Sequence, residues 1–306
     1  MLKQVQSRSA VFFISLWSLF VFTSCDRVEG TGRGHLLLTS QEDENKMGEQ
    51  AYQEVISKEK RSTDASVIAQ VERVGRRLIA TAPNHGFNYE FTVLESDTVN
   101  AFCLPGGKVC VYTGILPYCK NEAGLATVMA HEIAHAIARH GGERMSQGKI
   151  VDGLSVGLDA LIEDSGISPT TEKIAMTAFG VGTQYGVILP FSRKHELEAD
   201  YLGLTYMAKA GYDPLESVEF WKRFATLQSN MPAYFGTHPS SIDRANQLNG
   251  KMPEALNLYE STPKYGSGEL VPEPYRKEII PIPNVSSSKP ATKTQDENPK
   301  KKKKKK

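Results

Sequence analysis

The sequence predicts an α+β fold that is mainly helical, with a small mixed sheet ahead of its central helix. Two observations carry this prediction. Apolar residues recur at helical spacing in several long segments, whereas residues 88–114 contain the short alternating runs that are typical of strands. The length of 306 residues suits one well-buried domain with tails, because single hydrophobic cores stop growing at roughly 250 to 300 residues.

The elements follow from these periodicities and from local start and stop signals. Helices are expected over residues 43–60, 64–82, 121–140, 193–210 and 215–227, and strands over 88–95, 98–103 and 108–114. Asp64 is the expected N-cap of the second helix, Gly141 and Gly142 are expected to stop the third, and Gly211 the fourth. The uncharged interval 174–192 is interpreted as a partly helical segment and loop near the active site, with a membrane-dipping segment as the alternative. Its glycines and proline argue against a membrane span, because they loosen a helix.

The N-terminus has the layout of a signal peptide, with Lys3 and Arg8 ahead of the uncharged stretch 10–22. Cys25 directly follows the small residues Thr23 and Ser24, an arrangement that resembles the lipobox of bacterial lipoproteins. We therefore expect residues 1–24 to be a lipoprotein signal peptide, with an ordinary signal peptide as the alternative. Cys25 would then anchor the chain to the periplasmic side of the bacterial cell envelope, at the inner or the outer membrane.

The predicted organisation is a tether over residues 25–42, a catalytic domain over 43–262 and a disordered proline-rich tail over 263–306. The tail ends in seven lysines, Lys300 to Lys306, so the net charge of +1 becomes +1 − 7 = −6 for the rest of the chain. A mildly acidic body excludes a nucleic-acid-binding core. The tail is expected either to be solvated or to contact an anionic partner such as lipid.

Three cysteines remain after Cys25, and two of them flank the turn formed by Pro105, Gly106 and Gly107. Cys103 and Cys110 are expected either to form a disulfide across this hairpin or to be two buried thiols. The chain has no Cys-x-x-Cys pair, so a thiolate zinc site is not indicated.

The run His131-Glu132-Ile133-Ala134-His135 lies within the helix expected over 121–140. Residues four apart on a helix differ by about 40° in azimuth, so His131 and His135 can bind one Zn²⁺ from one face. Glu132 lies about 100° around the helix from His131 and can act as a general base without being a ligand. The motif predicts one zinc ion per chain and hydrolysis by a metal-activated water.

A catalytic zinc site of this kind needs a third protein ligand. The extended pattern HExxHxxGxxH would require Gly at position 138 and His at position 141, where this sequence has Ala138 and Gly141. His140, nine residues after His131, falls on the opposite face of a continuous helix and is interpreted as structural.

The segment 191–200 supplies carboxylates from a second helix. Glu196 and Asp200 share one face of it, so Glu196 is the predicted third ligand and Asp200 the acceptor for a ligand histidine's N–H. Glu198 points about 200° away from Glu196, and it is expected, like His195, to face solvent.

These motifs together resemble metallopeptidase family forty-eight, the HtpX and CAAX prenyl protease family, in its branch of soluble lipoprotein proteases without internal membrane spans. The resemblance covers about residues 45–250. The segments that carry it are His131 to His135, Glu196 with Asp200, Asn100-Ala101-Phe102, Pro105-Gly106-Gly107, Thr113-Gly114 and Thr237-His238-Pro239.

The resemblance implies a gluzincin fold in which the edge strand of the sheet binds an extended peptide. Val109, Val111 and Thr113 are expected on that edge strand. His238 matches a family position that lies near the metal or stabilises the tetrahedral oxyanion, and it is the second expected catalytic residue. From the residues alone, a histidine in the turn before a helix opened by Pro239 is slightly favoured.

The predicted function is a zinc-dependent metalloendopeptidase in the quality control of misfolded or misassembled envelope proteins. The alternative is a lipid-anchored chaperone or assembly factor with little or no proteolysis, and a weaker one is an amidase acting on peptidoglycan. The intact set His131, Glu132, His135 and Glu196 favours the protease, because a scaffold has no need for a base beside a metal.

Overall fold

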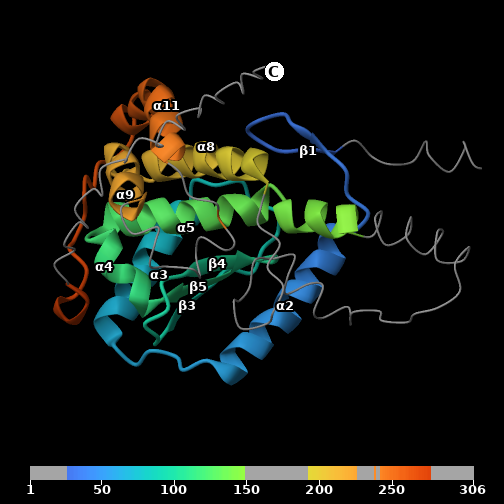
Figure 1. Ribbon diagram of the computed structural model, residues 1–306, viewed down its shortest axis with the longest axis horizontal. Helices are drawn as coiled ribbons and strands as arrows, with labels where there is room; N and C mark the ends of the chain where they lie inside the picture. Colours follow the sequence, from blue (N-terminus) through green and yellow to red (C-terminus); the bar gives the residue numbers. More distant parts are fainter. Residues whose placement is uncertain (1–25, 149–191, 226–237, 239–241, 277–306) are drawn as a thin grey trace, which may run out of the picture.

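The computed structural model describes residues 26–148, 192–225, 238 and 242–276. Its helices are α2 (Gln41–Lys58), α3 (Ala65–Ile79), α4 (Leu116–Cys119), α5 (Glu122–Ile137), α8 (Arg193–Lys209), α9 (Leu215–Ala225) and α11 (Ile242–Glu260), with 3-10 turns η1 (Thr113–Ile115) and η3 (Glu273–Tyr275). The strands are β1 (Asp26–Arg27), β2 (Gly34–His35), β3 (Glu90–Leu94), β4 (Ala101–Leu104) and β5 (Lys108–Tyr112). The predicted α+β class, mainly helical with a small mixed sheet, is confirmed (Figure 1).

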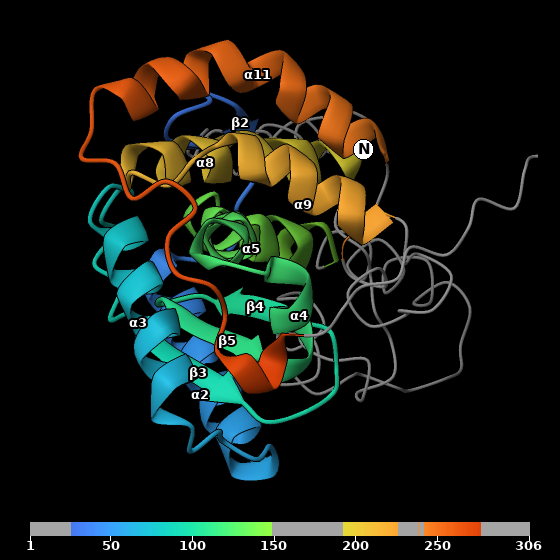
Figure 2. The ribbon, with the colours of Figure 1, turned by 90° about the vertical axis from the view of Figure 1, so that its left-hand side faces the viewer.

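The molecule is layered around α5. One face of this helix packs on β4 and the other on α8, and α11 covers α8 and α9. Figure 2 shows these layers in order, with α11 outermost, then α8, α5 and the sheet, and α2 beyond the sheet. Since every residue of α5 is buried, the helix that carries the His-Glu motif is the centre of the core.

The three-stranded sheet has the order β3-β5-β4, in which β5 runs parallel to β3 and antiparallel to β4. The expectation that Val109, Val111 and Thr113 belong to an edge strand is therefore wrong. Val109 and Val111 lie on the central strand, which pairs on both sides, and Thr113 lies in η1 after the strand ends. The edges of this sheet, within the described residues, are β3 and β4.

The hairpin between β4 and β5 also decides the state of its cysteines. Cys110 pairs with Phe102, and Cys103 pairs with Val109, so the two cysteines are one step apart in register and point to opposite faces of the sheet. Cys103, Cys110 and Cys119, the cysteines of the described segments, are buried free thiols. The structure therefore confirms two buried thiols at Cys103 and Cys110, and not the alternative of a disulfide.

Helix α5 ends earlier than expected. Its last residue is Ile137, Arg139 has a left-handed φ of 55°, and residues 140–148 are helical again. Gly141 and Gly142, the expected stop, thus begin the next helical segment. A Cβ at Gly142 would lie 2.1 Å from Oε1 of Glu44, which shows that this glycine permits a close approach rather than a helix end.

The ordered domain is longer at both ends than the predicted 43–262. Residues 26–35 form a hairpin of β1 and β2 in which Val28 is buried, instead of a polar tether. Near the other end, Leu270 bridges to Asn121, and Val271 is 1% exposed. The described residues do not include the expected signal peptide over 1–24, Cys25, most of the interval 174–192 or the lysines at 300–306.

For helix α11 the sequence favoured only a helix opened by Pro239, without bounds, and the structure has α11 over Ile242–Glu260. Its pattern is interrupted by Pro253 inside the helix and by Gly250. Among the described helices, none combines the length with the apolar character that crossing a bilayer requires.

Candidate metal centre

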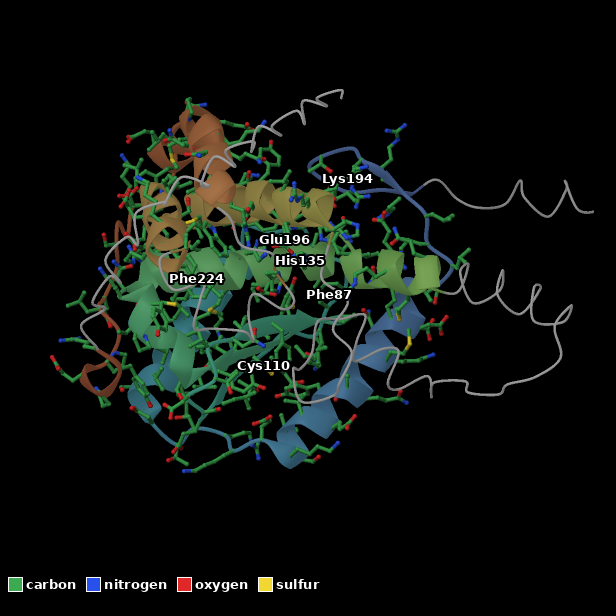
Figure 3. All side chains as sticks on the ribbon, in the orientation of Figure 1. Phe87, Cys110, His135, Lys194, Glu196 and Phe224 are labelled. Atoms are coloured by element: carbon green, nitrogen blue, oxygen red, sulfur yellow. The ribbon has the colours of Figure 1, made fainter. Side chains whose placement is uncertain are left out.

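Two helices bring the candidate ligands together. The side chain of Asn121 caps α5 by accepting a hydrogen bond from the N–H of Gly124 at 2.9 Å, and Ser192 caps α8 in the same way. The two helices approach closely at Gly203, where a Cβ would lie 2.9 Å from the backbone nitrogen of His131. This close approach places Glu196 of α8 beside the histidines of α5, as Figure 3 shows for His135 and Glu196.

Four buried side chains, His131, His135, Glu196 and His238, present ligand atoms that all lie within 4.8 Å of one another. Nε2 of His131 is 3.1 Å from Nε2 of His135. Oε1 of Glu196 is 3.3 Å from Nε2 of His135 and 3.0 Å from Nδ1 of His238. The structure thus gathers the three predicted ligands and adds His238 as a fourth group.

These separations fit a tetrahedral metal site. Zinc binds histidine nitrogen and carboxylate oxygen at about 2.0–2.2 Å, so the ligand atoms of a tetrahedron lie roughly 3.4 Å apart. The distances of 3.0–3.5 Å between the atoms of this group match that value. Three imidazoles and one carboxylate are also a donor set that zinc prefers.

The comparisons with known proteins agree with this centre. The family model described as Peptidase family M48 matches residues 65–252, which is more than half of the chain. The chain belongs to peptidase family M48. It is therefore a metallopeptidase, and the α+β fold described above is that of an M48 peptidase.

Curated relatives of the M48 chain span two groups. The mitochondrial metalloendopeptidase OMA1 of Schizosaccharomyces pombe is 36% identical over 81% of this chain and 72% of its own length. The human metalloendopeptidase OMA1 is 30% identical over 80% of this chain but 49% of its own length. The beta-barrel assembly-enhancing protease of Escherichia coli is 30% identical over 72% of this chain and 47% of its own length.

These M48 relatives correct one prediction. A place in the bacterial cell envelope was expected from the N-terminal sequence, yet the OMA1 proteins of fission yeast, budding yeast and human are all mitochondrial enzymes. The mitochondrial location of these relatives overturns the expected one, which depended only on the N-terminal pattern of charge, apolar run and small residues.

At the candidate metal centre, His131 lies beside two buried groups. Its Nδ1 lies 3.0 Å from Oδ1 of Asp200, so Asp200 occupies the place expected for the acceptor of its N–H. Arg244 of α11 donates to both oxygens of Asp200, at 2.6 and 2.7 Å, and its Nη1 lies 3.0 Å from Oε2 of Glu196. The guanidinium is stacked 3.7 Å from the centre of the Trp221 ring.

Arg244 is the residue that the sequence reasoning missed. It is the third residue of α11, whose bounds were not predicted, and it lies six residues after His238 and 44 residues after its partner Asp200. The sequence feature that could have indicated it is an arginine a few residues after the His-Pro pair. It could not be interpreted without knowing that α11 lies over α8.

His135 is held on the other side of the centre. Its Nδ1 is 2.8 Å from Nδ1 of His140, whose Nε2 is 2.9 Å from Oε2 of Glu198. Glu198 and His195 are buried, at 7% and 3% exposure, so the expectation that both face solvent was wrong. The reason is that the β1–β2 hairpin covers this face of α8, and its Arg33 lies 2.6 Å from Glu198.

The electrostatics favour an ionised carboxylate among the histidines. Although burial raises the pKa of Glu196, the charges of His238 and Arg244 and hydrogen bonds from His131 and His135 hold it well below its usual value. Burial and Arg244 lower the pKa of His131, but Asp200 and Glu196 outweigh them and raise it to about 9. A metal ion would therefore meet an anionic Glu196 and displace a proton from His131.

A second ion-pair group lies nearby, between Arg33 and Glu143, whose charged atoms are 2.8 Å apart. Burial raises the pKa of Glu143, but hydrogen bonds with His195 and Arg33 lower it to about 2. A carboxyl whose pKa is depressed by folding stabilises the protein above its unfolded pKa of about 4.5, and this contribution is lost as pH falls toward 2.

We expect Glu143→Gln to lower the free energy of unfolding at pH 7 by about 1–2 kcal/mol, a value that allows for partial screening by solvent. The difference between the variant and the unchanged protein should shrink between pH 4.5 and pH 2. Urea unfolding followed by circular dichroism at several pH values measures this. A difference that stays constant down to pH 2 would contradict the assignment.

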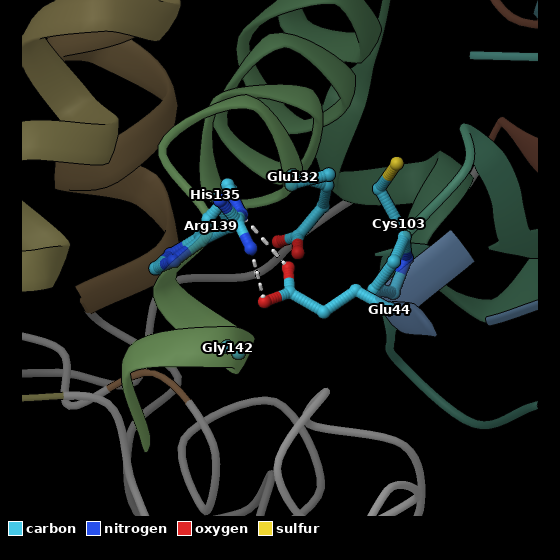
Figure 4. A pocket seen from close by; sticks show the side chains of 9 residues that line it. Glu44, Cys103, Glu132, His135, Arg139 and Gly142 are labelled. Atoms are coloured by element: carbon cyan, nitrogen blue, oxygen red, sulfur yellow. Dashed lines mark hydrogen bonds and ion pairs between the residues drawn. The ribbon is translucent and has the colours of Figure 1, made fainter. Parts of the chain in front are cut away.

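Glu132 faces a small cavity beside α5 (Figure 4). One carboxylate oxygen lies 3.6 Å from Nε2 of His238. The cavity, about 10 Å³ in volume, is the size of one water molecule and is lined by Glu132, His135, Cys103, Glu44 and Arg139, among others. Arg139 donates to both oxygens of Glu44, at 2.7 and 3.1 Å, so a neutralised ion pair closes this end of the cavity.

Proposed function

We propose that this chain is a zinc-dependent metalloendopeptidase whose ion is held by His131, His135 and Glu196. The convergence of their three ligand atoms in a buried site, one helical step from Glu132, is the observation that carries the proposal. When bound, zinc lowers the pKa of a coordinated water to about 7 and polarises a carbonyl oxygen.

Glu132 is the proposed general base. It follows His131 directly on α5, so its carboxylate faces the cavity beside His135 and does not lie among the ligand atoms. From this position Glu132 accepts a proton from the attacking water and delivers it to the leaving amine. Its burial, at 2% exposure, keeps bulk water away from the transferred proton.

The position of His238 is proposed to control the access of water and peptide to the metal site. Catalytic zinc sites have three protein ligands and an open fourth position, whereas Nδ1 of His238 lies 3.3 Å from His131 and 3.0 Å from Glu196. We infer that His238 would supply a fourth ligand atom in the resting protein. Its ring would then have to move away before water and a peptide could enter.

A peptide substrate is proposed to lie along β4. This strand is at an edge of the sheet and packs against α5, and Cys103 at its end lines the cavity together with Glu132. An extended peptide that adds to a strand edge is bound through its backbone. We therefore propose unfolded or misassembled proteins as substrates, a class compatible with the name of the beta-barrel assembly-enhancing protease of Escherichia coli.

Glu132→Gln tests the mechanism. We expect it to retain about one zinc per chain, because the ligands are unchanged, and to lose about 100-fold or more of the casein-cleavage rate, the low end for removing a general acid-base group. Metal analysis and cleavage assays on the purified chain measure the two quantities.

The matched control is Glu72→Gln, an exposed carboxylate on α3 that pairs with Arg76. It should retain both zinc and full activity. Equal cleavage by the Glu132→Gln variant and the unchanged protein would refute the mechanism, and the absence of zinc from the unchanged protein would refute the metal assignment.

A further inference from the structure

One histidine outside the four candidate ligands contacts one of them directly. Nδ1 of His140 lies 2.8 Å from Nδ1 of His135. His140 is completely buried, and its ring stacks on that of His195 with the centres 4.4 Å apart and the planes 16° apart. The left-handed Arg139 brings it there, because the break in α5 turns His140 back toward a residue that a continuous helix would carry away from it.

The hydrogen bonds fix the direction of each proton. Nε2 of His135 points at the other ligand atoms, at 3.1 Å from His131 and 3.3 Å from Glu196. It can bind a metal only without a proton, so a neutral His135 carries its proton on Nδ1. Nδ1 of His135 then donates to His140, and Nε2 of His140 donates to Glu198 at 2.9 Å.

Glu198 is in turn held by the N-terminal hairpin. Nε of Arg33 donates to Oε2 of Glu198 at 2.6 Å, and the hydroxyl of Thr31 donates to Oε1. Arg33 also donates a hydrogen bond to Glu143. The second carboxylate oxygen of Glu143 lies 3.2 Å from Nε2 of His195. Hydrogen bonds therefore connect residues 31–33 to a candidate metal ligand more than 100 positions away in the chain.

We propose that His140 is a positioning residue for the metal ligand His135, and that the N-terminal hairpin holds it in place through Glu198. This inference rests on the proposed metal site. Glu198 accepts hydrogen bonds from Thr31, Arg33 and His140, which fix its position. Because His140 donates to Glu198 through Nε2, its Nδ1 carries no proton and can act as an acceptor. That acceptor selects the tautomer and the ring orientation of His135 that are needed for binding, as outer partners of ligand histidines do in metal sites.

The two ligand histidines of α5 are then held independently. Asp200 and Arg244, from α8 and α11, hold His131, whereas His140, Glu198 and Arg33 hold His135. The hairpin is thus a part of the metal centre, and its detachment from α8 weakens metal binding without removing a ligand.

The test compares His140→Phe with His140→Asn in the full chain. Phenylalanine keeps a ring against His195 but removes both nitrogens, whereas the amide oxygen of asparagine can still accept from His135. Competition for zinc with a chromogenic chelator should give an affinity about 10- to 100-fold weaker for His140→Phe, and a smaller loss for His140→Asn. Arg33→Met should weaken the affinity in the same direction.

Two further readouts separate positioning from a general packing role. The visible spectrum of the cobalt-substituted protein reports ligand geometry and should change in His140→Phe, and the melting temperature of the metal-free protein reports packing. Arg76→Met, which removes an exposed ion pair on α3, is the control that should change neither.

Unchanged zinc affinity and an unchanged cobalt spectrum in His140→Phe would overturn the inference. If His140→Phe does not fold, His140→Asn and Arg33→Met decide by the same two measurements. An unchanged protein that binds no zinc refutes the proposed function instead, so the two failures are distinguishable.

Discussion

Replacing Glu196 with alanine is expected to leave a folded chain that retains no zinc after dialysis and cleaves no casein. Structural zinc sites are worth about 10–16 kcal/mol shared among four ligands, so one ligand carries on the order of 3 kcal/mol, roughly a hundredfold in affinity. The loss is larger here because Glu196 is the only anion among the four ligand groups. Without it, a cation would enter a site that already contains Arg244 and three histidines.

The matched variant is Glu198→Ala, two positions further along the same helix. Glu198 touches His140 rather than a ligand atom, so this variant should bind about one zinc when the metal is supplied in excess, although more weakly. Zinc stoichiometry of both variants, measured with and without excess metal, makes the comparison. Zinc retained by Glu196→Ala and lost from Glu198→Ala would show that the ligand has been assigned to the wrong carboxylate.

Replacing Arg244 with methionine is expected to lower the free energy of unfolding by about 3–5 kcal/mol, the usual cost of removing one partner of a buried ion pair. Arg244 is 2% exposed, and its removal leaves the carboxylates of Asp200 and Glu196 without their cation. For a domain of this size the melting temperature should fall by about 10 °C. Thermal unfolding of the metal-free protein measures this.

A double variant sharpens the Arg244 test. Asp200→Asn removes the charge that Arg244 neutralises, so Arg244→Met combined with Asp200→Asn should lose less stability than the sum of the two single changes. Arg76→Met, an exposed arginine in an i,i+4 pair, should change stability by less than about 0.5 kcal/mol. Additive losses in the double variant would mean that the two side chains act separately.

Local signals predicted the helices well. Asp64 caps α3 as expected, and its buried face consists of the apolar stripe that includes Val67, Val71, Val74 and Leu78. The gathering of His131, His135 and Glu196 also depends on local geometry, because each helix presents its side chains at fixed angles. Once both helices were predicted, the ligands could meet if the two helices packed face to face. The structure shows that this packing also depends on the small Gly203, which lies on α8 where it contacts α5.

The errors concern contacts between distant segments. Nothing within β5 distinguishes a central strand from an edge strand, since the partner β3 lies beyond the hairpin in the sequence. His140 was placed on the wrong face because helical angles apply only to a continuous helix, and the left-handed Arg139 interrupts α5. The burial of Glu198 depends on a hairpin 165 residues earlier in the chain.

The proposed ligands come from two parts of the chain, because His135 lies on α5 and Glu196 on α8, 196 − 135 = 61 positions later. An ion held between them closes that length of chain into a loop. Because such a site rarely exists in the unfolded chain, the ion would stabilise the protein by binding to its folded form alone. Such a cross-link is reversible, and it is removed by chelation instead of reduction. A molecule without its metal would therefore lack peptidase activity and this stabilisation together, so we expect the inactive form to be degraded more readily by other proteases.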